Sequence, residues 1–97
     1  MLVAISTYTK SLTEVDVHRT EHLEYIKRTL VATHKLLLAG RKNPANGAVI
    51  LAKDMTADEL KKILADDPYC IAGVAEYQII EFHPVLFAEM LRDLVTE

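Results

Sequence analysis

The chain has 97 residues, of which 51% are hydrophobic and 26% are charged, and its formal net charge is −3. This length suits a single domain over residues 1–97, and the apolar content is too high for intrinsic disorder. Nucleic-acid-binding and membrane-surface proteins use basic faces, so an acidic chain with scattered lysines and arginines is expected to bind neither. The high apolar fraction is instead a first indication of self-association.

Cysteine content and the N-terminal residues predict the compartment. Cys70 is the single cysteine, which excludes an intramolecular disulfide and argues against a cysteine-based zinc site. The first residues lack the basic stretch of a signal peptide, and no segment approaches the roughly 20 apolar residues of a membrane span. We therefore expect a soluble cytoplasmic protein in which Cys70 is a small buried apolar residue.

The first half of the chain predicts a strand, a helix and a hairpin. Residues 2–8 are short and β-favouring. Residues 14–33 carry apolar side chains at helical spacing, and Thr13 is the expected N-cap. Residues 36–40 and 48–52 are apolar runs too short for helices, and an Asn-Gly pair lies in the turn between them, which favours a β-hairpin.

The second half predicts a helix, a strand and a last helix. Thr56 and Glu59 form a capping box that begins the second helix, and Asp67-Pro68 ends it, because a residue before proline avoids the α conformation. Residues 75–82 alternate imperfectly and favour a fourth strand. The last helix is expected to carry an apolar stripe of Leu86, Phe87, Met90, Leu91 and Leu94.

The resulting order, β-α-β-β-α-β with an extra C-terminal helix, is the ferredoxin-like α+β fold. Right-handed crossovers place both crossover helices on one face of the sheet. Val49 and Ile50 point to opposite faces, as do Leu2 and Val3, so the second face is apolar as well. The C-terminal helix and a second copy of the sheet are expected to cover that face, which predicts a homodimer.

Candidate chemistry begins with His22, which shares a helical stripe with Arg19 and Ile26. Such a half-buried stripe is either packed surface or the wall of a cavity. A histidine that acts as a base needs a carboxylate on one ring nitrogen, which leaves the other nitrogen free. Asp67 is the candidate carboxylate, although a helix stop with solvated acids explains its segment about as well.

Arg19, Tyr8 and Tyr69 are candidate substrate-binding residues. The Arg19 guanidinium suits a substrate carboxylate or a developing oxyanion, or it pairs with an acidic neighbour such as Asp16. The two tyrosines would supply a hydroxyl or an aromatic wall, or they belong to the core or the interface. The other histidines are too dispersed for a metal site and no glycine-rich phosphate loop occurs, so neither a metal nor a cofactor is expected.

Short motifs occur in order along the chain: Arg19-x-x-His22-Leu23, Leu38-Ala39-Gly40, Asp67-Pro68-Tyr69 with Ala72-Gly73, and Phe82-His83-Pro84. Together they resemble the successive signatures of the YCII-like family. The family fold is a ferredoxin-like dimeric α/β barrel. The resemblance implies that His22 and Asp67 form the active-site pair, in a small pocket near the dimer interface. One family member is a dehydrochlorinase of a chlorinated hydroxyquinol, and related barrels isomerise or oxygenate small ring compounds.

Two residues depart from the family pattern. His34 stands near a helix end where glycine is common, a position that accepts the left-handed conformation. Arg41 follows Gly40 where the family often has proline. Neither residue is expected to touch His22 or Asp67, but both are expected to reshape the pocket rim.

Three functions follow from these features. The first is an enzyme without a cofactor, in which His22 and Asp67 drive elimination or isomerisation of a small cyclic organic acid or phenol. The second is a non-catalytic homodimer that binds a small ligand in the same pocket. The third is a scaffold whose C-terminal helix docks another protein.

Overall fold

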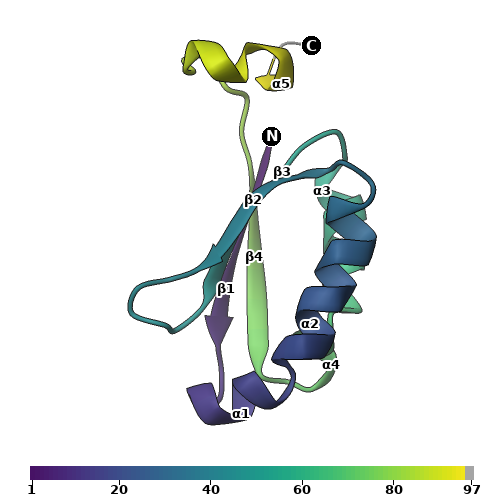
Figure 1. Ribbon diagram of the computed structural model, residues 1–97, viewed down its shortest axis with the longest axis vertical. Helices are drawn as coiled ribbons and strands as arrows, with labels where there is room; N and C mark the ends of the chain where they lie inside the picture. Colours follow the sequence, from purple (N-terminus) through teal and green to yellow (C-terminus); the bar gives the residue numbers. More distant parts are fainter. Residues whose placement is uncertain (96–97) are drawn as a thin grey trace.

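The computed structural model describes residues 1–95 and contains the expected α+β elements (Figure 1). Helices α2 and α3 cover one face of a four-stranded antiparallel sheet of order β2-β3-β1-β4, so the predicted ferredoxin-like fold is confirmed. The strands are β1 Leu2–Tyr8, β2 Leu36–Arg41, β3 Ala48–Ala52 and β4 Ala75–Glu81. The helical segments are α1 Leu12–Val17, α2 Arg19–Ile26, the π-helical turn η1 Lys27–Val31, α3 Ala57–Ala65, α4 Pro68–Ile71, the 3-10 turn η2 Glu89–Leu91 and α5 Arg92–Val95. The last two residues of the single predicted domain lie outside the described residues, and its extent stays a prediction.

The sheet register determines which strand residues reach the helices. Leu2 pairs with Ala52, and Ala4 pairs with both Ile50 and Ile79, so these side chains share the helix-covered face. Leu2, Ala4, Ile50 and Ala52 are at most 2% exposed. Burial of such apolar side chains is the main stabilising term for a domain of this size. The helices complete this core with Ile26, Leu30, Leu60 and Leu64.

The first helix differs from its prediction in two ways: it begins at a different residue, and it is interrupted. It begins after Ser11, not Thr13, because the Ser11 hydroxyl accepts the Glu14 backbone N–H at 3.3 Å. It also breaks at His18, whose φ of −101° and ψ of 5° separate α1 from α2. Leu23 was expected on the buried side of one continuous helix, but it is 41% exposed.

Two predicted turns are confirmed. His34 has a φ of 59°, the left-handed conformation expected near the end of the first helical segment. Strands β2 and β3 pair as an antiparallel hairpin. In the turn between them, a Cβ on Gly47 would lie 1.9 Å from the Ser6 carbonyl oxygen, so this position requires glycine.

Among residues 1–95, the opposite face of the sheet is left largely uncovered. The C-terminal helix was expected to cover part of it, but the described part of α5 has four residues and follows an extended segment past the end of the sheet (Figure 1). It borders the face at a groove that Leu94 shares with Leu38 and Leu51. Leu38, Val49 and Ile80 on this face are 61%, 36% and 43% exposed. The uncovered apolar face also includes Val3, Ile5 and Leu51.

Candidate active site

The fold brings His22 of α2 and Asp67, which precedes α4, into direct contact. His22 Nδ1 and Asp67 Oδ1 are 2.7 Å apart, although the two residues are separated by 45 positions. Asp67 is 0% exposed and His22 is 9% exposed. The alternative interpretation of Asp67 as a solvated acid at a helix stop is therefore wrong.

Asp67 is held in place by the short helix that follows it. Its backbone is extended, and its Oδ1 accepts the Tyr69 backbone N–H at 3.2 Å as the N-cap of α4. Pro68 occupies the first helical position, where its missing N–H costs nothing. The Asp-Pro pair was interpreted only as a helix end. It also begins a new helix, and the cap turns the carboxylate toward His22.

Tyr77 holds the second carboxylate oxygen and was not among the predicted site residues. Its hydroxyl donates to Asp67 Oδ2 at 2.7 Å. Burial, followed by the charge of Asp67, raises the pKa of the Tyr77 phenol, so the hydroxyl stays a donor at neutral pH. The sequence signal was a tyrosine at an inward position of β4, because a buried phenol needs a hydrogen-bond partner.

These contacts leave one nitrogen of His22 open. A carboxylate only accepts hydrogen bonds, so the contact requires the proton of the neutral imidazole to lie on Nδ1. Nε2 has no hydrogen-bond partner among residues 1–95, and no buried side-chain nitrogen or oxygen in this range lacks one. Nε2 is therefore accessible from outside, with its lone pair available to take a proton.

Tyr77→Phe is expected to lower the free energy of unfolding by about 1–3 kcal/mol, because a buried carboxylate oxygen loses its donor. Urea denaturation measures the change. Tyr25→Phe is the matched control: its hydroxyl donates to the Ile63 carbonyl at 2.7 Å and not to the Asp67 carboxylate. We expect Tyr77→Phe alone to shift the nitrogen NMR signals of His22. Unchanged His22 signals would show that Tyr77 does not position the pair.

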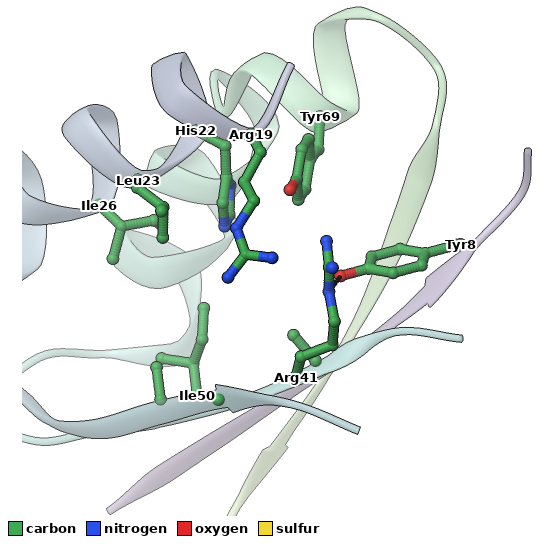
Figure 2. A pocket seen from close by; sticks show the side chains of 11 residues that line it. Tyr8, Arg19, His22, Leu23, Ile26, Arg41, Ile50 and Tyr69 are labelled. Atoms are coloured by element: carbon green, nitrogen blue, oxygen red, sulfur yellow. Dashed lines mark hydrogen bonds between the residues drawn. The ribbon is translucent and has the colours of Figure 1, made fainter. Parts of the chain in front are cut away.

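His22 lines a pocket between α2 and the sheet, with a volume of about 180 Å³ (Figure 2). The Tyr69 ring stacks on the imidazole with centroids 3.9 Å apart and an interplanar angle of 6°. Tyr8 meets Tyr69 edge-on at 6.0 Å. A dry cavity of about 150 Å³ holds benzene, so this pocket suits one substituted ring. The apolar part of the lining includes Leu23, Ile26 and Ile50.

Two arginines reach the pocket from different elements (Figure 2). Arg19 projects from α2, and it forms no ion pair with an acidic neighbour among residues 1–95, contrary to the alternative interpretation. Asp16 pairs instead with Arg41, whose Nη2 lies 2.6 Å from Asp16 Oδ1. The Nε of Arg41 donates to the Tyr8 hydroxyl at 3.0 Å. Arg41 was expected to reshape the rim, and it forms part of the lining itself.

Other chemistry-bearing residues lie outside this arrangement. Within residues 1–95, no three His, Cys, Asp or Glu side chains are placed to hold a metal ion. Cys70 is half-buried, less than predicted, and burial together with the charge of Asp67 raises the pKa of its thiol to about 11. The thiol is therefore protonated at neutral pH. In the same range, no helix has the length and hydropathy needed to cross a bilayer.

Comparison with known protein families identifies the chain. A family model described as the YCII-related domain matches residues 1–83. The chain belongs to the YCII-related family. The resemblance drawn from the short sequence segments is thereby confirmed, and both His22 and Asp67 lie in the matched part of this YCII-related domain.

One solved structure extends this comparison. The YCII-related chain is similar to 5-chloro-2-hydroxyhydroquinone dehydrochlorinase from Burkholderia phenoliruptrix AC1100, solved in complex with 2,5-dihydroxybenzoquinone. The TM-score is 0.65, and the match covers 84% of this chain and 93% of that one. The sequence identity is 17%, so the likeness establishes the fold. No protein with a curated description matches the chain.

Proposed function

We propose that this YCII-related domain is a small-molecule enzyme in which His22 is the general base and Asp67 orients it. The observation that carries the proposal is the 2.7 Å contact at Nδ1, which leaves Nε2 open to the pocket. Asp67 fixes the tautomer that presents the Nε2 lone pair, and its charge stabilises the imidazolium formed when Nε2 accepts a proton. Tyr77 acts through Asp67 as a positioning residue.

The reaction class supported best is elimination or isomerisation of a small cyclic compound. In an elimination, Nε2 takes a proton from the substrate and the leaving group departs as an anion with the bonding electrons. The ring would lie against Tyr69, which is already stacked on the imidazole. Arg19 would stabilise negative charge that develops on a substrate oxygen. The named activity of the structurally similar dehydrochlorinase supports elimination over isomerisation.

A panel of halogenated hydroquinones and small cyclic acids tests this proposal. Halide release and ultraviolet spectra are recorded with the wild-type protein and with His22→Ala. His83→Ala serves as the matched control, because His83 is exposed and lies outside the pocket. Turnover that requires His22 but not His83 supports the enzyme. Calorimetric binding with no turnover would instead indicate a ligand-binding protein, the second function considered.

We also propose that two copies pair through the uncovered sheet face as a homodimer. A contiguous apolar face of this kind is typical of an interface. Ile80→Lys is expected to shift the wild-type dimer toward monomer in sedimentation velocity, because it places a charge in the interface. Ile71→Lys is the control, since Ile71 is 72% exposed on α4, away from this face.

A wild-type protein that sediments as a monomer at micromolar concentration would contradict the homodimer. Equal effects of the two lysine variants would contradict the proposed face. The pocket reaches the edge strand β2 through Ala39 and Gly40, and its expected position near the interface belongs to this same proposal.

A further inference from the structure

Arg41 is the charged pocket residue that the proposed reaction leaves without a role. It is the last residue of β2 and extends across the pocket toward the side that carries His22 and Tyr69 (Figure 2). Its side chain is 22% exposed. A guanidinium at such a position loses hydration, so a specific set of partners must compensate.

Two contacts fix the orientation of this guanidinium. Nε donates to the Tyr8 hydroxyl at 3.0 Å, and Nη2 lies 2.6 Å from Asp16 Oδ1. The Arg41 Cζ lies 5.5 Å from the centroid of the Tyr8 ring, within cation–π range. Nη1 takes part in neither of these two hydrogen bonds, and the guanidinium also interacts with the hydroxyl of Tyr69, which lines the same pocket. The guanidinium has five N–H donors, so its contacts with Tyr8, Asp16 and Tyr69 hold it in place and still leave N–H groups for a ligand.

The charges around the cavity favour an anion. Arg19 forms no ion pair among residues 1–95, and its guanidinium points into the same space (Figure 2). Asp16, the counter-ion of Arg41, is 42% exposed, so solvent screens part of its negative charge. Asp67 is fully buried behind His22. Two guanidinium groups thus face the cavity, and a ligand anion would complete their hydrogen bonding.

We propose that Arg19 and Arg41 form an anion subsite and that the substrate is a small ring compound bearing a carboxylate. The proposal rests on the proposed function, because the ring must lie beside His22 for the carboxylate to reach both arginines. A carboxylate matches the planar guanidinium fork better than a phenolate does.

Matched ring compounds measure the subsite without turnover. The probes are 2,5-dihydroxybenzoate and hydroquinone, which share the ring and both hydroxyl groups and differ by the carboxylate. Calorimetry of the wild-type protein is expected to give the carboxylate a Kd about 10–100-fold lower, as charge-assisted hydrogen bonds allow. The preference is expected to shrink as sodium chloride is added, because salt screens the pairing.

Substitutions then show which residues cause the preference for the carboxylate probe. Arg41→Gln and Arg19→Gln are each expected to reduce it about tenfold or more while hydroquinone binding stays within about twofold. Lys42→Gln removes the neighbouring positive charge, which does not line the pocket, and is expected to change neither Kd. Arg41→Lys keeps the charge but not the fork, and is expected to retain part of the preference.

Equal Kd values for the two probes in the wild-type protein, or no binding of either, would overturn the subsite. A preference for the carboxylate probe that persists in both Arg19→Gln and Arg41→Gln would also overturn the subsite. A carboxylate preference combined with turnover that does not need His22 would leave the subsite standing and remove the catalytic proposal. Turnover of neutral rings that requires His22, with no preference for the carboxylate probe, would support the catalytic proposal and remove the subsite.

Discussion

His22→Ala is expected to lower kcat by about 10²–10⁴-fold on any substrate that the wild-type protein turns over, the usual contribution of a general base. The substitution removes the imidazole whose Nε2 presents a proton acceptor next to the stacked Tyr69 ring. The loss should appear in kcat and kcat/KM together, because the interaction arises in the transition state. Steady-state kinetics with the first substrate found in the panel measures it.

Asp67→Asn tests the orienting role of the carboxylate while the His22 imidazole stays in place. An amide presents a donor as well as an acceptor, so it stabilises the wrong imidazole tautomer and no longer stabilises the imidazolium. We expect a kcat loss comparable to that of His22→Ala, and no further loss in the double variant, since the two residues act as a unit. Full activity of either single variant would remove the proposed mechanism.

Asp67→Ala is expected to lower the free energy of unfolding by about 3–5 kcal/mol, because each buried donor left without its acceptor costs about 1–3 kcal/mol. Three donors lose their acceptor at once: His22 Nδ1, the Tyr69 backbone N–H and the Tyr77 hydroxyl. The α4 N-cap is lost with them. Urea denaturation followed by far-ultraviolet circular dichroism measures the change through the midpoint at constant slope.

Asp66→Ala is the control for this stability prediction. Asp66 is the adjacent acid, it is exposed, and it forms no side-chain hydrogen bond or ion pair among residues 1–95. Its substitution is expected to change the free energy of unfolding by about 0.5 kcal/mol or less. Similar midpoints for the two alanine variants would show that the buried network at Asp67 contributes little to folding.

Strand positions and topology were predictable because they depend on burial, which the sequence records directly. The apolar runs at residues 36–40 and 48–52 are too short for helices, and both became strands of the predicted hairpin. The contact between His22 and Asp67 has a different origin. It spans 45 positions and depends on α2 and α4 meeting over one face, so the family resemblance indicated it and local pattern did not.

The missed features depend on contacts that no local pattern contains. The break at His18 has no glycine or proline to mark it, and helical residues flank it on both sides. Arg41 gained its role from Asp16, which is 25 positions away on α1. The C-terminal stripe suggested a long helix, but within residues 1–95 the segment forms only the short turns η2 and α5, which border the sheet at an apolar groove lined by Leu38 and Leu51.

The double duty of Asp67 has a consequence for interpreting related sequences. One carboxylate both starts the helix that carries Tyr69 and orients the proposed base. A relative that had lost catalytic activity would still need this aspartate in order to fold. The presence of this aspartate in a sequence therefore indicates the fold and not the activity. Truncation of the histidine leaves the helix cap intact, so loss of the histidine is the change that would mark an inactive relative.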